Sequence, residues 1–181
     1  MVKIFPFIFI LLWSSAFITT KPIIDNSDPF SALAFRFSMV AIGFFLYSIY
    51  TKQKIFISKI NFIESFFSGV LFHGLYLGGV FFSISKGMPT GIAALIVTLQ
   101  PILTNALSGP ILNEKVTIKQ WIGVILGFIG ATLVLGLDIG SKIPIAGLVA
   151  TIIALIAITS STIWQKKISN NLPLSVSNMY Q

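Results

Sequence analysis

Hydrophobic residues are gathered into long runs along this chain, and short polar segments separate the runs. A helix that crosses the ~30 Å hydrocarbon core of a bilayer needs about 20 largely apolar residues, because no water is present there to satisfy the backbone. Six runs approach this length, namely Ile4 to Thr20, Pro29 to Tyr50, Phe66 to Ser85, Gly91 to Leu112, Trp121 to Leu137 and Ile143 to Trp164. A shorter segment follows from Leu172 to Gln181. The pattern predicts an all-α, polytopic transmembrane helix bundle.

Composition and charge agree with a membrane protein. Hydrophobic residues make up 55% of the 181 residues, charged residues make up 9%, and the mean hydropathy is +0.95. These values exclude a water-soluble globule. If the N-terminus is cytoplasmic, eight lysines lie inside and three lie outside, which is the bias expected of short cytoplasmic loops. The net charge of +7 is therefore interpreted as an orientation signal and not as a surface for nucleic acid.

Patterns of catalytic and metal-binding residues are absent from the sequence. The chain has one histidine and no cysteine, and it contains no H-E-x-x-H, G-x-S-x-G or Walker-type glycine motif. We therefore predict no enzyme activity, no metal and no cofactor. The first run begins like a secretory signal, with cleavage after the serines of W-S-S-A-F as an alternative, but it is long for a signal core and lacks a clear A-x-A site.

Arg36 is the one basic residue that falls inside an apolar run. It lies about seven residues into the second run, which places it ~10 Å below the outer boundary at 1.5 Å per residue. A guanidinium at that depth costs several kcal/mol unless it snorkels or finds a partner. Two interpretations stay open: snorkelling to the outer head groups, or an inward position that binds a carboxylate substrate or holds neighbouring helix ends.

His73 lies about halfway along the third run and is the second candidate. On an α-helix, Gly69 at i−4 and Tyr76 at i+3 share its face. We expect this face either to line a cavity with a titratable group and an aromatic platform, or to hold a hydrogen-bonded core histidine.

The fourth run carries amides near mid-membrane. Pro101 removes a backbone donor and frees the carbonyl of Val97, which would open the helix where Gln100 and Asn105 present their amides. A kinked helix with bonds between helices is the alternative. Glu114 ends this run near water and suits a structural or gating role better than proton transfer.

Glycines are spaced for close helix contact in two runs. Gly74 and Gly78 form G-x-x-x-G in the third run, and Gly123 and Gly127 do so in the fifth, continued by Gly130. Small residues also follow the sixth run: Ala146, Gly147, Ala150, Ala154 and Ala157. Such faces let helix backbones approach closely in lipid.

One stretch resembles a known family. The segment "GMPTGIAALIVTLQPILTNALSGPILNEKVTIKQWIGVILGFIGATLVLG", residues 87–136, is similar to the signature of the EamA-type branch of the drug/metabolite transporter superfamily. Pro101, Glu114, Gln120, Gly123 and Gly130 occupy its characteristic places. The tryptophan of "LLWSSAF" and the arginine of "PFSALAFRF" also resemble the first two helices of that family.

The resemblance implies a secondary transporter with ten helices in two inverted five-helix repeats, which exports small metabolites such as amino acids by alternating access. Residues 1–137 would form the first repeat, and residues 138–181 would begin the second, so the sequence resembles a truncated member. The implied cavity has six candidate substrate-binding residues: Trp13, Arg36, His73, Tyr76, Gln100 and Asn105. Its implied surroundings are the bilayer of an inner, cytoplasmic membrane, with the N-terminus in the cytoplasm.

Two other interpretations stay open. The chain could be a non-transporting membrane scaffold or a remnant of such a transporter. It could also be a subunit that forms a homodimer with both orientations, although the lysine bias opposes dual insertion.

Overall fold

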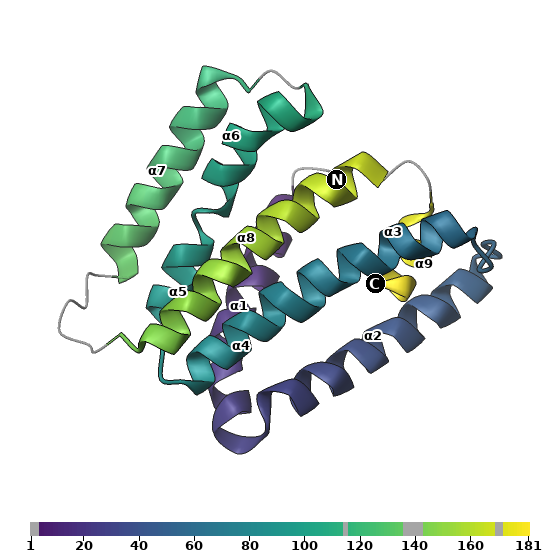
Figure 1. Ribbon diagram of the computed structural model, residues 1–181, viewed down its shortest axis with the longest axis horizontal. Coiled ribbons are helices and arrows are strands. Elements are labelled where there is room, and N and C mark those ends of the chain that lie inside the picture. The colour runs from purple at the N-terminus through teal and green to yellow at the C-terminus, as the bar shows by residue number, and fades with distance from the viewer. Residues whose placement is uncertain (1–3, 114–115, 136–142, 169–171) are drawn as a thin grey trace.

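The computed structural model describes residues 4–113, 116–135, 143–168 and 172–181. Every regular element in these residues is a helix, which confirms the predicted all-α bundle (Figure 1). The elements are α1 (Phe5–Asn26), α2 (Pro29–Tyr50), α3 (Lys59–Gly69), η1 (Val70–Leu77), α4 (Gly78–Ser85), α5 (Thr90–Val97), α6 (Gln100–Leu112), α7 (Ile118–Leu135), α8 (Ile145–Ile168) and α9 (Leu174–Tyr180).

Four helical segments of the described residues are long and apolar enough to cross a membrane: Pro29–Tyr50, Lys59–Ser85, Thr90–Leu112 and Ile145–Ile168. In α7, the part from Ile118 to Gly130 is a shorter apolar helix, and spanning by α1 and α7 stays a prediction. Many large apolar side chains on these helices are exposed, for example Phe35 and Met39 on α2. Such a surface suits lipid.

Two predicted boundaries were wrong, each for a local reason. The third helical segment begins at Lys59 and not at Phe66, because the Ser58 side chain caps it by accepting from Asn61 N at 3.2 Å. The first helix continues past Thr20 to Asn26, where the ion pair between Lys21 and Asp25 (3.1 Å) supports another turn.

Helix α8 lies at the centre of the bundle. In Figure 1 it runs between the α3–η1–α4 segment on one side and α5, α6 and α7 on the other. Its small residues meet α4 closely: a Cβ on Gly79 would lie 3.1 Å from Ala150 O and 3.2 Å from Ala154 Cβ. Ala154 is fully buried. The predicted small-residue face of this helix is therefore confirmed at its contact with α4.

The predicted glycine faces on the other two helices differ from expectation. Gly79, and not Gly74, makes the close contact with α8, and a Cβ on Gly74 would meet no atom within 4 Å. A Cβ on Gly123, Gly127 or Gly130 of α7 would also meet no atom within 4 Å. The described residues therefore form no close helix contact at the α7 glycines, whose packing role stays a prediction.

Hydroxyl groups join α8 to the α3–η1–α4 segment inside the apolar core. The Ser83 hydroxyl donates to Gly147 O at 2.8 Å and lies 2.7 Å from the Thr151 hydroxyl. Further along, the Ser68 and Ser161 hydroxyls are 3.4 Å apart, and both residues are buried. Interhelical bonds of this kind hold membrane helices together where lipid offers no hydrophobic drive.

The fourth apolar run forms two helices, and the break between them lies just before Pro101, as predicted. Helix α5 ends at Val97 and α6 begins at Gln100, with Pro101 in its first turn, where a missing backbone N–H is tolerated. A break before Pro101 is therefore confirmed, and the bond from Gln100 to Thr162 of α8 fits the alternative of a kinked helix with bonds between helices. Glu114 and the predicted boundary between residues 137 and 138 lie outside the described residues.

Candidate functional site

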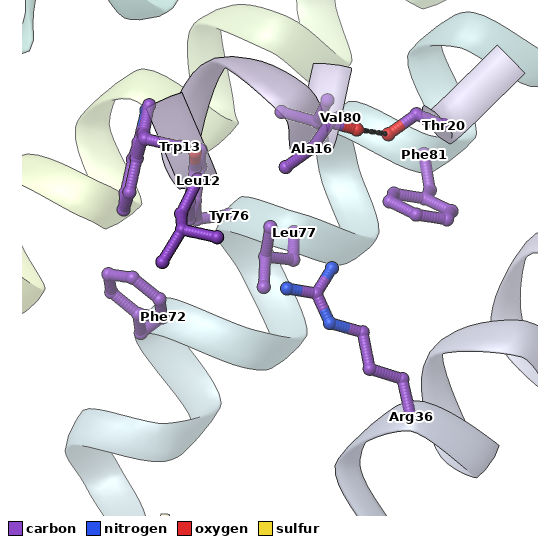
Figure 2. A pocket seen from close by; sticks show the side chains of 10 residues that line it. All are labelled: Leu12, Trp13, Ala16, Thr20, Arg36, Phe72, Tyr76, Leu77, Val80 and Phe81. Carbon is purple, nitrogen blue, oxygen red and sulfur yellow. Dashed lines mark hydrogen bonds between the residues drawn. The ribbon is translucent and has the colours of Figure 1, made fainter. Parts of the chain in front are cut away.

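A cavity of about 240 Å³ lies between α1, α2 and the η1–α4 segment. We call it the aromatic cavity (Figure 2). Its ten lining residues come from α1 (Leu12, Trp13, Ala16, Thr20), α2 (Arg36), η1 (Phe72, Tyr76, Leu77) and α4 (Val80, Phe81). Residues 13, 16 and 20 follow each other at i+3 and i+4, so one face of the α1 helix supplies them.

Stacked and tilted rings form one wall of the aromatic cavity. The Trp13 and Tyr76 rings are nearly parallel, at 9°, and their centroids are 6.4 Å apart. Phe72 meets Tyr76 edge-on, with centroids 5.3 Å apart. Tyr76 is only 2% exposed, so packing holds its ring in place. This wall offers a flat apolar surface to a solute.

Arg36 is the cation of the aromatic cavity. Figure 2 shows its side chain extending from α2 toward Leu77 of η1. Within the part of the chain that the structure describes, no carboxylate lies within ion-pair distance of Arg36, and its guanidinium has no hydrogen bond. A guanidinium at this depth of a membrane helix favours an anionic partner. Arg36 therefore lines the cavity and is itself exposed, and both interpretations left open by the sequence stay predictions.

His73 lines a different cavity from Tyr76 but the same groove as Gly69, so the predicted shared face is confirmed for Gly69 and wrong for Tyr76. The segment η1 is a π-helix, and its i→i+5 bonds widen the turn, so the α-helical i+3 spacing no longer brings two side chains together. The His73 ring packs on Phe37, with centroids 4.5 Å apart. It lines a second, mostly apolar groove together with Gly69 and Gly74. Its Nδ1 atom is buried and has no hydrogen-bond partner within the described residues.

Gln100 and Asn105 also lie outside the aromatic cavity. The Gln100 amide donates to the hydroxyls of Thr104 at 3.1 Å and Thr162 at 3.2 Å, which ties α6 to α8. Asn105 lines a separate cavity of about 130 Å³ with Ser108, Gln120 and Lys166 among its neighbours. We call Gln100, Thr104, Asn105 and Thr162 the amide cluster.

The structure thus divides the six candidate residues into three places. Trp13, Arg36 and Tyr76 meet in the aromatic cavity, His73 lines the second groove, and Gln100 and Asn105 belong to the amide cluster. Sequence reasoning missed Phe72 and Phe81 in the aromatic cavity and Thr162 in the amide cluster. The spacing of Trp13, Ala16 and Thr20 was a usable signal for the α1 side, whereas nothing in the sequence pattern indicated the π-helical turns.

Comparison with known proteins finds relatives among membrane transporters. The chain is 24% identical over 165 residues to a Salmonella typhimurium protein named "Probable amino-acid metabolite efflux pump", covering 91% of this chain and 53% of the relative. An Escherichia coli protein of the same name is 23% identical, with 90% and 52% covered. Protein PecM of Dickeya dadantii is 33% identical over 102 residues, with 56% and 34% covered. No solved structure matches the chain significantly.

The chain spans about half the length of the two efflux-pump relatives. Their names describe transporters and not enzymes, in agreement with the lack of catalytic motifs in this sequence. The long apolar helices and these relatives together identify a multi-pass membrane protein. Residues 3–136 match the EamA-like transporter family, and the chain therefore belongs to that family.

Proposed function

We propose that this chain forms part of a secondary transporter that exports small metabolites, amino acids or related compounds, by alternating access. Membership of the EamA-like family and the names of the efflux-pump relatives support the class of solute. The relatives are about twice as long as this chain. The complete transporter would therefore have further helices that close the aromatic cavity from another side.

The unpaired cation beside the stacked rings carries this proposal. Arg36 offers a planar fork of donors, which suits a carboxylate bound through two oxygens. Trp13, Phe72 and Tyr76 offer apolar surface for the rest of the solute. The cavity is smaller than the ~300–1,000 Å³ pockets of drug-sized ligands. We propose that it takes a small carboxylate with an apolar side chain.

The arrangement in the membrane follows from the same proposal. The N-terminus lies in the cytoplasm, residues 1–137 form one five-helix repeat, and residues 138–181 begin a second repeat of opposite orientation. The family match over residues 3–136 supports this division, and the lysine bias supports the orientation in an inner membrane. In this topology the α1 and α4 residues of the aromatic cavity lie toward the outer side.

The test is transport by the protein made from the complete reading frame of the gene, reconstituted in proteoliposomes. We expect Arg36→Gln to lower the flux of apolar amino acids at least about tenfold, because a charge-assisted hydrogen bond contributes about 1.5–3 kcal/mol. Arg36→Lys should keep part of the flux, since the charge remains but the fork is lost. Tyr47→Phe is the control, since Tyr47 is exposed on the same helix outside the cavity.

Two outcomes would contradict the proposal. Equal flux of an amino acid by wild type and Arg36→Gln would remove Arg36 from the substrate site. Stable insertion of the protein into the membrane with no flux of any amino acid tested would favour the non-transporting scaffold.

A further inference from the structure

The connection between α2 and α3 presents two different faces. Residues 53–58 have no helical structure, and alternate side chains differ in exposure along them. The half-buried side chains are Gln53, Ile55 and Ile57, and the exposed ones are Lys54, Phe56 and Ser58. This alternation is the period of an extended backbone, in which successive side chains point to opposite sides. One edge of the connection therefore faces the protein, and the other faces outward.

Helix α9 holds the inward edge in place. The Ser175 hydroxyl donates to the Gln53 side-chain oxygen, and the Tyr180 hydroxyl donates to Ile55 O at 3.2 Å. The Gln53 backbone N–H donates to Ser48 O at 2.9 Å, which fixes the connection to the end of α2. Figure 1 shows α9 beside α3, at the end of the bundle where α2 joins α3. The outward edge is therefore a fixed surface.

Positive charge and aromatic rings are concentrated on this outward surface. We call residues 50–59 the basic-aromatic segment. It contains three lysines, Lys52, Lys54 and Lys59, and no acidic residue. All three are exposed and have no ion pair within the described ranges. Tyr50 and Phe56 are 85% and 86% exposed.

The basic-aromatic segment lies at the membrane boundary. It joins two of the segments that are long and apolar enough to span a bilayer, Pro29–Tyr50 and Lys59–Ser85, so it is placed at the level of the lipid head groups whichever way the chain is oriented. Aromatic rings are favoured at that level, and lysines near the surface attract anionic lipid. This placement is the same whether or not the protein transports a solute.

We propose that the basic-aromatic segment binds the head group of an anionic phospholipid, with the lysines around the phosphate and Phe56 inserted among the neighbouring acyl chains. Charge complementarity selects the lipid: the segment has three unpaired positive charges, and a zwitterionic head group carries no net charge to match them.

The test is native mass spectrometry of the purified chain with equal concentrations of phosphatidylglycerol and phosphatidylcholine. We expect wild type to retain phosphatidylglycerol preferentially. The variant K52Q/K54Q/K59Q should lose about tenfold or more of that preference, since each lysine near the surface contributes about 1 kcal/mol to binding of anionic lipid. The matched control K21Q/K86Q/K142Q removes the same number of lysines from the segments at the opposite ends of the helices and should keep the preference.

A second variant separates the ring from the charge. Phe56→Ser should weaken retention of both lipids, whereas Phe56→Tyr should retain both, with the helical circular dichroism signal unchanged in each. No preference for phosphatidylglycerol in wild type would overturn the proposal. An equal loss of preference in the two triple variants would also overturn it, because the effect would then follow net charge and not this segment.

Discussion

The aromatic cavity and the amide cluster both contain polar side chains that lie between membrane helices. The two regions differ in the hydrogen bonds that these side chains make. In the amide cluster, Gln100 donates to two threonine hydroxyls on α6 and α8. In the aromatic cavity, Arg36 has no hydrogen bond or ion pair within the described residues, and it lines the cavity together with Trp13 and Tyr76. The bonds of Gln100 account for that side chain as helix packing, whereas we interpret the unpaired Arg36 beside an open cavity as a group that binds a ligand.

After Arg36, the largest effect that separates the two regions is expected at Trp13. Trp13→Leu removes the ring stacked on Tyr76 and keeps the site apolar, and an aromatic pair contributes about 0.5–1.5 kcal/mol beyond its buried area. We expect the KM for apolar amino acids to rise by up to about tenfold. Trp121→Leu makes the same change on α7, outside the aromatic cavity, and should leave KM unchanged in the same flux assay.

An intermediate effect, on stability and not on transport, is expected at Gln100. Gln100→Met keeps the size of the side chain and loses its bonds to Thr104 and Thr162. The free energy of unfolding in detergent should fall by about 1 kcal/mol, as for other interhelical bonds in membranes. The KM should stay within about twofold of wild type if this cluster only packs helices.

A double-variant cycle with Thr162→Val checks the assignment of the amide cluster. The Thr162 hydroxyl also donates to Ile158 O within its own helix, at 2.8 Å, so the cycle isolates the bond that joins the two helices. A rise in KM as large as that of Trp13→Leu would place the amide cluster in the substrate path and remove the distinction between the two regions.

The smallest effect is expected at Asp28, which caps the helix that carries Arg36. The backbone N–H of Ser31 donates to its carboxylate at 2.8 Å and lowers the pKa of Asp28 below its ordinary value of 3.8. A lowered pKa stabilises the folded state above the unfolded value, and this contribution is lost as pH falls through the folded pKa. Asp28→Ala should therefore melt slightly below wild type at pH 7.

The pH dependence of the melting temperature is the control that shows whether the Asp28 carboxylate acts in the cap. The melting difference between wild type and Asp28→Ala should shrink as pH falls from about 3.8 through the lower pKa of the folded state, because the folded carboxylate is then protonated. Asp28→Asn should stay close to wild type at pH 7 and melt above it at low pH, because asparagine also caps helices and does not titrate. A difference that does not change with pH would show that the charge of the carboxylate has no part in the cap.

The sequence predicted the helices better than it predicted the site. Apolar runs of bilayer length are a strong signal, and the Pro101 break and the small residues of α8 followed known rules. The shared face of His73 and Tyr76 failed because it assumed α-helical turns where the chain forms the π-helix η1. Only the three-dimensional arrangement shows that Trp13, Arg36 and Tyr76 meet while Gln100 is occupied by its neighbours.

The most direct test of the central claim is a binding cycle on Arg36. The affinity of an apolar amino acid and of its carboxamide would be measured by calorimetry for wild type and for Arg36→Gln, using the protein from the complete reading frame. We predict that wild type binds the carboxylate at least about tenfold more tightly than the carboxamide, and that Arg36→Gln binds both equally. The same preference for the carboxylate in both proteins would contradict the assignment of Arg36 as the group that binds substrate.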